Sequence, residues 1–404
     1  NIVKGTTVVE EKDEDENLEI LFQQLRFGVF LGPHHPLNEN PTLALDRDLQ
    51  LIELLDHLDF DEAWVGEHHS GGFEIISAPE IFIAAAAERT KYIRLGTGVK
   101  SLPFYHPFLV ADELVQLDHM TRGRVMFGAG PGALPTDAYQ MGIDPKDQRR
   151  RMDEALNAIV PLMKGETVSL ETDWFTLKNA RLQLDSYSKP MMEMAVTSIK
   201  SPAGAISAGK FGAGLLVLGG MSDEALKIQC SNWEVCQETA KSNDQMVGRN
   251  KWRITVMTHL SDSLDQAKDD LKFGLQKWVD YSHNVLPNSP FPVSIQDPIN
   301  YGIENKILLV GTPEDAIREI ERIDKITGGF GVFLMFAHNF VPWKAAKKSY
   351  ELMARYVIPY FRQSNSLRQK SYDVAKNIHE RLQTDFNDAV KAADADYKQQ
   401  NKKD

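Results

Sequence analysis

From residue 25 onward the chain repeats one pattern: a short apolar segment, a loop that contains Gly or Pro, and an amphipathic helix. The apolar segments lack the polar alternation of a strand with one solvated face, so they are predicted to be buried parallel strands. We expect eight of them, at residues 25–30, 62–65, 93–97, 125–128, 192–196, 214–218, 253–257 and 331–336. Eight β/α units predict an α/β fold of the (β/α)8 TIM-barrel type, with a doubly wound open sheet as the alternative.

The helix that follows the first strand illustrates the periodicity of the helical segments. Leu45, Leu49, Ile52 and Leu55 fall on one face at helical spacing, and Thr42 is placed to cap the amino end. Such a stripe is typical of a helix that covers one side of a barrel.

Two insertions interrupt the regular spacing. About 60 residues separate the fourth strand from the fifth, and the alternation at 172–184 predicts a small hairpin outside the barrel. After the seventh strand, residues 283–307 are rich in Pro, Asn and Ser, which predicts a long functional loop that acts as a lid.

The two ends of the chain differ from the barrel, which is predicted to span residues 25–362. Residues 1–24 are predicted to form an acidic extension that is too charged to pack. LEILFQ at 19–24 resembles a 3C-type protease recognition sequence, so this segment is either the remnant of a cleavage tag or a natural tail. Residues 363–404 are predicted to form one amphipathic helix with an apolar stripe: Val374, Ile378, Leu382, Phe386 and Val390. This stripe should pack on the barrel or on a second subunit.

Composition excludes several classes of protein. The net charge of −12 argues against a nucleic-acid partner, and no apolar run approaches the roughly 20 residues of a membrane-spanning helix. The two cysteines, Cys230 and Cys236, are poorly spaced for a disulfide, so we expect inert thiols in a reducing, cytoplasmic protein.

In a TIM barrel the reactive groups gather at the carboxyl ends of the strands. Seven of the 11 histidines are predicted to lie there: His34, His35, His68, His69, His106, His259 and His338. A metal site is one interpretation, but the histidines at 34–35 and 68–69 are adjacent pairs whose side chains diverge on an extended segment. We therefore predict no metal.

A phosphate-bearing cofactor is the second interpretation. Small or Gly-rich loops occur at the same predicted face: TGVKSLP at 97–103, GAGPGALP at 128–135, TSIKSPAG at 197–204 and LGG at 218–220. Hydroxyls and free backbone amides at the start of a helix bind phosphate, and Ser198 and Ser201 precede a helix that Pro202 is predicted to begin.

Several motifs occur in the order found in a known family. FGVFLGP at 27–33, WVGEHHS at 64–70, IRLGTGV at 93–99 and QLDHMTRGRVMFGAGPG at 116–132 resemble the bacterial luciferase-like flavin-dependent monooxygenases, in the limonene or alkanal monooxygenase-like branch. The resemblance implies a homodimer that receives reduced FMN from a separate flavin reductase. It further implies a flavin 4a-hydroperoxide that oxygenates a small apolar aldehyde, ketone or terpene.

The resemblance also implies roles for individual residues. His68 would be the catalytic residue, with Glu67 and His69 holding its loop. The cofactor would be bound by residues from four loops: Thr97 and Ser101, Gly130, Thr197 with Ser198 and Ser201, and Gly219.

Gly130 and Pro131 depart from the luciferase catalytic subunit, which has a reactive cysteine and a phosphate-binding arginine at these places. Loss of this arginine should weaken phosphate binding, so either Arg149, Arg150 or Lys200 compensates or the flavin is held loosely. Three other functions stay open at this point: a deazaflavin-dependent oxidoreductase, a metal-dependent hydrolase and a non-catalytic flavin-binding protein.

Overall fold

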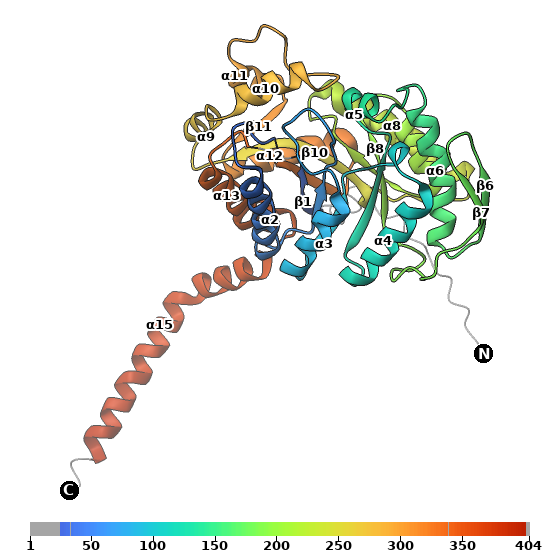
Figure 1. Ribbon diagram of the computed structural model, residues 1–404. Coiled ribbons are helices and arrows are strands. Elements are labelled where there is room, and N and C mark those ends of the chain that lie inside the picture. Colours follow the sequence, from blue (N-terminus) through green and yellow to red (C-terminus); the bar gives the residue numbers. More distant parts are fainter. Residues whose placement is uncertain (1–24, 33, 338, 401–404) are drawn as a thin grey trace, which may run out of the picture.

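The computed structural model describes residues 25–32, 34–337 and 339–400. Within them, eight parallel strands close into a barrel with helices around it (Figure 1). Its strands are β1 (Arg26–Leu31), β2 (Glu62–Val65), β3 (Arg94–Thr97), β5 (Val125–Gly130), β8 (Met194–Ser198), β9 (Gly214–Val217), β10 (Trp252–Leu260) and β12 (Val332–Ala337). The TIM-barrel prediction is confirmed, and the open-sheet alternative is wrong because β12 pairs with β1 from Arg26↔Val332 to Leu31↔Ala337.

Helices follow the strands in the expected order. The outer layer consists of α2 (Pro41–His57), α3 (Pro79–Arg89), α4 (Pro107–Thr121), α6 (Gln148–Met163), α7 (Ala203–Phe211), α8 (Asp223–Ser242), α12 (Pro313–Thr327) and α13 (Trp343–Leu352). Shorter elements are η1 (Leu102–Phe104), α5 (Pro135–Gln140), η2 (Arg249–Lys251), α9 (Leu264–Leu271), α10 (Leu275–Asn284), α11 (Pro298–Glu304), the π-helical η3 (Met353–Val357) and α14 (Ile358–Phe361).

Some local predictions need correction. Asn40 rather than Thr42 caps α2, because its side-chain oxygen accepts from the backbone amides of Thr42 and Leu43. The predicted hairpin exists but begins earlier, as β6 (Val168–Glu171) paired antiparallel with β7 (Thr176–Ala180). Two strands were not predicted, β4 (Lys100–Ser101) beside β5 and β11 (Leu308–Gly311) beside β10.

The insertion after β10, residues 261–307, is more ordered than the predicted lid loop. It contains α9, α10 and α11, which lie together at the top of Figure 1. The Trp278 ring packs against Phe291 and Phe340 at centroid distances of 6.2 and 5.6 Å, within an apolar cluster of its own. The Pro, Asn and Ser residues of 283–307 therefore lie mainly in the connections between short helices.

Bulky side chains fill the barrel interior, which excludes a ligand from its centre. Trp64 is fully buried there, and a Cβ atom at Gly96 would lie only 2.5 Å from its ring. Below it, Arg253 Nε donates to Glu62 Oε2 over 2.7 Å, and both residues are 0% exposed. The space for chemistry is therefore at the carboxyl ends of the strands, which we call the mouth.

The carboxyl-terminal segment forms α15 (Ser366–Gln400), which projects away from the barrel (Figure 1). The predicted acidic extension at 1–24 lies outside the described residues, as do 401–404. Among the helices of the described part, none is long and apolar enough to cross a membrane.

Candidate active site

The imidazole of His68, directly beyond β2, lies between two carboxylates. Nδ1 is 3.3 Å from Asp137 Oδ2, and Nε2 is 3.5 Å from Glu74 Oε2. Asp137 belongs to α5, beyond β5, and also accepts hydrogen bonds from the backbone amide of His69 and the hydroxyl of Ser70. The His68 side chain is 14% exposed, so it is held firmly yet open to a ligand.

Opposing effects set the pKa of His68. Burial is the largest and lowers the pKa, but the charges of Glu74 and Asp137, with the hydrogen bond to Asp137, together raise the pKa above its ordinary value. Burial also raises the pKa of Asp137, yet hydrogen bonds from His68 and Ser70 outweigh it and hold that pKa below its usual range. The opposite shifts of the two pKa values favour an imidazolium beside a carboxylate at pH values between them.

The insertion after β10 reaches this histidine through Tyr281 of α10. Its hydroxyl donates to Glu74 Oε1, and its ring packs on Phe73 at 5.0 Å between centroids. Phe73 stacks on His34 at 4.7 Å with an interplanar angle of 7°. Burial lowers the pKa of His34 to about 4, with the neighbouring charge of His35 acting in the same direction. A neutral, aromatic wall thus stands beside the charged His68 cluster.

Glu67 and His69 make contacts away from His68. His69 Nε2 is 3.1 Å from Glu67 Oε1 and 3.3 Å from the Tyr105 hydroxyl. Glu67 also accepts from the backbone amide of Ser101, while the Lys100 ammonium lies 3.5 Å from the centroid of the Tyr105 ring. The two imidazoles therefore diverge as predicted, and these contacts tie the loop after β2 to the loop after β3.

Three cofactor candidates lie at the end of β8 and in the loop that follows it. Ser198 is buried and accepts from Asn232 Nδ2 over 3.1 Å, whereas Ser201 is exposed and accepts from Arg149 Nη1 over 2.8 Å. Thr197 is half-buried, and a Cβ atom at Gly130 would lie 3.0 Å from its hydroxyl oxygen. The loop leads into α7, which starts at Ala203, with Pro202 at the N-cap position instead of the predicted first helical position.

Arg149, Arg150 and Lys200 were the candidate replacements for the missing arginine. Arg149 of α6 contacts Ser201, whereas the guanidinium of Arg150 is paired with Asp147, Glu154 and Asp173. Lys200 is exposed within the loop itself. Geometry therefore favours Arg149 over Arg150 as a cation facing this loop.

The remaining cofactor candidates occupy the loops around the mouth. The Thr97 hydroxyl is fully buried and bridges to Gly128, donating to its carbonyl and accepting from its amide, so it joins β3 to β5. Ser101 is also buried, at the end of β4. A Cβ atom at Gly219 would lie 3.3 Å from Gln229 Nε2, whose amide group donates to the carbonyl of Gly220.

The other predicted histidines do not join His68. His35 Nε2 is 2.8 Å from Asp48 Oδ2, His259 Nε2 is 2.9 Å from Asp270 Oδ2, and His106 packs edge-on to Phe175. His338 lies outside the described residues. Within the described part of the chain, no three His, Cys, Asp or Glu side chains form a group that could hold a metal ion.

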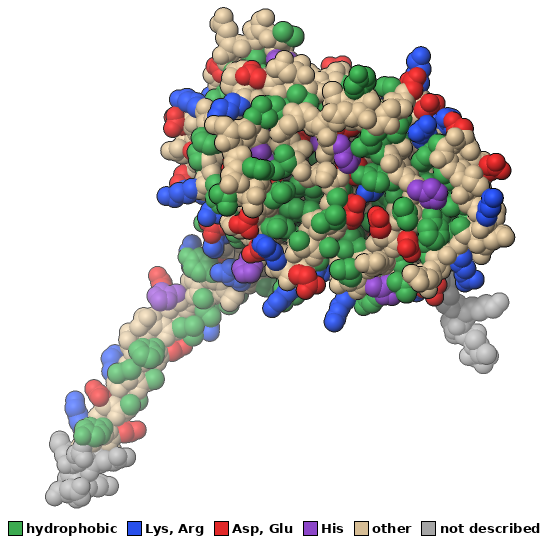
Figure 2. All heavy atoms as spheres, in the orientation of Figure 1, with side chains coloured by type: hydrophobic (Ala, Val, Ile, Leu, Met, Phe, Trp, Pro, Cys, Tyr) green, Lys and Arg blue, Asp and Glu red, His purple; other side chains and the backbone are tan. Residues whose placement is uncertain are grey.

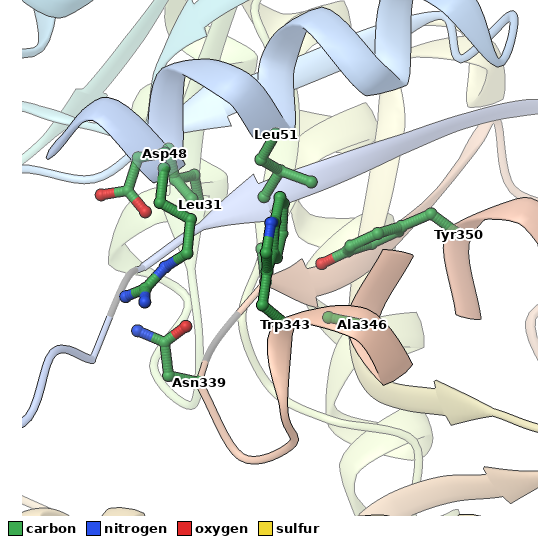
Figure 3. Close-up of a pocket in the computed structure, with 9 residues that line it drawn as sticks. Leu31, Asp48, Leu51, Asn339, Trp343, Ala346 and Tyr350 are labelled. Carbon is green, nitrogen blue, oxygen red and sulfur yellow. The ribbon is translucent and has the colours of Figure 1, made fainter. Parts of the chain in front are cut away.

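A small pocket lies between α2 and α13 beside the ends of β1 and β12. Leu51, Trp343 and Tyr350 form one side, and Asp48 and Asn339 lie at the other (Figure 3). Its volume of about 20 Å³ suits roughly one water molecule. It is therefore too small for a flavin.

Three residues of the His68 cluster were absent from the sequence-based candidates: Glu74, Asp137 and Tyr281. Asp137 lies two residues after the loop GAGPGALP, at 128–135, so its place beyond a barrel strand was a usable signal. Tyr281 lies in an insertion, and periodicity carries no information about which loop an inserted helix touches.

These features define a class: a (β/α)8 barrel whose mouth combines an imidazole held between two carboxylates, an aromatic wall and a hydroxyl-rich helix start. A family model described as "Luciferase-like monooxygenase" matches residues 25–328. The chain therefore belongs to the luciferase-like monooxygenase family and is an enzyme, as the motifs predicted.

Two relatives cover nearly the whole barrel. The chain is 43% identical to limonene 1,2-monooxygenase of Rhodococcus erythropolis, over 88% of this chain and 92% of the relative. It is 42% identical to 4-hydroxyprotoasukamycin monooxygenase of Streptomyces nodosus subsp. asukaensis, over 84% of this chain and 93% of the relative.

A solved structure shares the fold. The oxygenating constituent of 3,6-diketocamphane monooxygenase from Pseudomonas putida, a type II Baeyer-Villiger monooxygenase in complex with FMN, superposes with a TM-score of 0.70 at 23% identity. The match covers 83% of this chain and 98% of that chain, and at this identity it establishes the fold alone.

Proposed function

We propose that this enzyme is an FMN-dependent monooxygenase that inserts one oxygen atom of O₂ into a small apolar organic substrate. The observation that carries the proposal is the His68 imidazole, held between Asp137 and Glu74 at the mouth. Membership of the luciferase-like family supports the reaction class.

The donor groups near α7 fit the phosphate of FMN. Ser201 and Thr197 offer hydroxyls, Arg149 offers a guanidinium, and no described side chain caps the amino end of α7. Free N–H groups at a helix start and a nearby cation are suited to a phosphate dianion. In the neighbouring loop, after β9, no atom lies within 4 Å of a Cβ built at Gly220, so this position is open.

Bound reduced FMN would supply two electrons, so that one oxygen atom enters the substrate and the other leaves as water. The protein would position the reactants and supply the proton. His68 would donate a proton from Nε2, because Nδ1 is held by Asp137, and general acid catalysis of this kind contributes about 10²–10⁴ in rate. Asp137 would keep the ring oriented and charged during this transfer.

The wall formed by Phe73, His34 and Tyr281 would bind the substrate and exclude water. These rings are mutually packed and carry no net charge when His34 is neutral. An aldehyde, ketone or terpene is therefore a better match than a charged metabolite, and the named activity of the limonene relative is consistent with this class.

We also propose a separate flavin reductase as the source of reduced FMN, a cytoplasmic location and a homodimer. The free thiols of Cys230 and Cys236 are consistent with a reducing compartment. Helix α3, with Ile81 71% exposed, offers an apolar surface for the dimer.

Product analysis under isotopically heavy dioxygen tests the function. The enzyme is mixed with reduced FMN and a panel of apolar alkenes, ketones and aldehydes, and products are examined by mass spectrometry. One heavy oxygen per product is expected, with loss of product in His68→Gln despite retained FMN binding. Oxidation that proceeds without oxygen and requires a deazaflavin would contradict the proposal, as would FMN binding without turnover of any substrate class.

A further inference from the structure

Two polar side chains interrupt the buried face of α8. The buried residues of this helix are Leu226, Gln229, Asn232, Trp233, Cys236 and Ala240. Gln229 and Asn232 are 1% and 4% exposed, and their spacing of three residues places them on the same side of the helix. Because burial of an amide costs free energy unless the amide forms hydrogen bonds, packing alone does not account for these two residues.

Each of the two amides holds one segment of the mouth. Asn232 Nδ2 donates to the Ser198 hydroxyl oxygen over 3.1 Å, and Gln229 Nε2 donates to the Gly220 carbonyl over 2.7 Å. Ser198 is the last residue of β8, and Gly220 lies in the loop after β9, which pairs with β8. Helix α8 therefore supports the mouth at two adjacent strand ends.

The Ser198 hydroxyl has a proton that the protein does not use. A serine hydroxyl accepts through its oxygen and donates one proton. The oxygen accepts from Asn232, and among the described residues no hydrogen bond is donated by Ser198. Since Asn232 is itself the donor, the Ser198 proton must point away from it. A buried donor without an acceptor is costly, so a bound group with acceptor oxygens would satisfy it.

The surroundings of Ser198 suit a phosphate as this acceptor. Three residues further on, the Ser201 hydroxyl accepts from Arg149 over 2.8 Å, and α7 begins at Ala203. Charged side chains of both signs are interspersed over the face of the molecule shown in Figure 2, so charge alone does not mark a phosphate site. An oriented hydroxyl adds direction to the charge of Arg149.

We infer that Asn232 is a positioning residue, which orients the Ser198 hydroxyl so that its proton is donated to the phosphate of FMN. This inference rests on the FMN-dependent function proposed above and gives α8 a part in it. Asn232 acts through Ser198. Gln229 makes the same kind of contact with a carbonyl, which has no proton to orient, so it offers a matched control.

Comparison of FMN with riboflavin isolates the phosphate, because the two flavins differ in that group alone. Quenching of flavin fluorescence gives both dissociation constants for the full chain. Asn232→Leu keeps the approximate size of the side chain and removes the donor. We expect its dissociation constant for FMN to rise about 3- to 10-fold, as the loss of one hydrogen bond predicts, with an unchanged constant for riboflavin. Gln229→Leu should change both constants by the same factor.

Asn232→Asp reverses the hydrogen bond while keeping the shape of the side chain. The carboxylate accepts the Ser198 proton, which withdraws that proton from the phosphate, and it adds a charge of the same sign as the phosphate. We expect the affinity for FMN to fall by about tenfold or more, with little change for riboflavin. Circular dichroism and thermal unfolding report on the fold of each variant, and Asn232→Asp carries the test if Asn232→Leu does not fold.

Ser198→Ala tests whether Asn232 acts through this hydroxyl. Ser198→Ala should itself raise the dissociation constant for FMN. Adding Asn232→Leu should then cause no further rise, because no hydroxyl remains to be oriented. Additive losses in the double variant would overturn the inference, and so would an unchanged affinity for FMN in Ser198→Ala.

The parent enzyme separates this inference from the proposed function. A parent that binds FMN no more tightly than riboflavin would contradict the phosphate site itself. A parent that prefers FMN, with the same preference in both Asn232 variants, would contradict only the role of Asn232. An equal loss of affinity for both flavins in these variants would also overturn the inference, because it would show a structural role.

Discussion

The hydroxyl of Tyr281 donates a hydrogen bond of 2.8 Å to Glu74 Oε1, and Glu74 in turn lies 3.5 Å from His68 through its other carboxylate oxygen. A residue of the insertion thus touches the carboxylate that helps to keep His68 charged. The placement of the insertion and the charge beside His68 are therefore linked through the Glu74 side chain.

Tyr281→Phe should therefore impair oxygenation without unfolding the insertion, because the ring keeps its packing on Phe73 and loses only its hydroxyl. We expect turnover to fall about three- to tenfold, as the loss of one hydrogen bond predicts. The ratio of product formed to oxygen consumed should also fall as water gains access. Tyr301→Phe, in the same insertion and packed on Phe291, is the matched control and should leave both values unchanged.

Arg149→Gln should weaken FMN binding by about 10- to 100-fold, because a charge-assisted hydrogen bond contributes about 1.5–3 kcal/mol. Quenching of flavin fluorescence during titration measures the affinity. Arg150→Gln removes an equal charge from the next position of α6, but Arg150 is paired with Asp173 and Glu154, so its affinity should match that of the parent. Equal losses in the two variants would argue against a specific phosphate contact.

The pH dependence of turnover should identify His68 as the proton donor. The pKa of His68 is raised in the folded protein. Below its ordinary pKa the imidazole is protonated and its ion pairs contribute their full stability. Both the proton and this stability are lost as pH rises through the raised pKa. Turnover should show an alkaline limb at that point. Glu74→Gln removes one of the charges that raise the pKa and should move the limb to lower pH. A limb in the same place in this variant would exclude His68 as its origin.

His34 should make the protein sensitive to acid. Because its pKa in the folded state is about 4 instead of 6.5, the unfolded chain takes up a proton that the folded chain rejects as pH falls between these values. We expect this residue alone to lower the free energy of unfolding by about 2 kcal/mol from pH 7 to pH 5. Urea unfolding of His34→Phe, which can keep the stack on Phe73, should show a smaller loss over the same range.

The barrel was predictable from sequence because its strands are largely apolar without regular polar alternation and its helices are periodic. His68 was predictable because it follows one of those strands. Its partners were harder to predict, since contacts between loops depend on the path of each loop in space. Asp137 approaches from α5 and Tyr281 from α10, at sequence separations of 69 and 213 residues from His68.

Clustering of histidines by predicted position was a weaker guide. His35 and His259 lie beyond barrel strands as expected, yet each is bound by an aspartate of its neighbouring helix. Position beyond a strand thus places a residue near the mouth without deciding where its side chain points.

The solid interior around Trp64 has a consequence for how this enzyme can change. The wall of Phe73, His34 and Tyr281, which we propose binds the substrate, lies outside the packed interior of the strands, so remodelling it would leave that interior intact. That wall belongs to loops and to an insertion with its own apolar cluster. Its shape can therefore change in evolution while the packing of the strands continues to stabilise the fold.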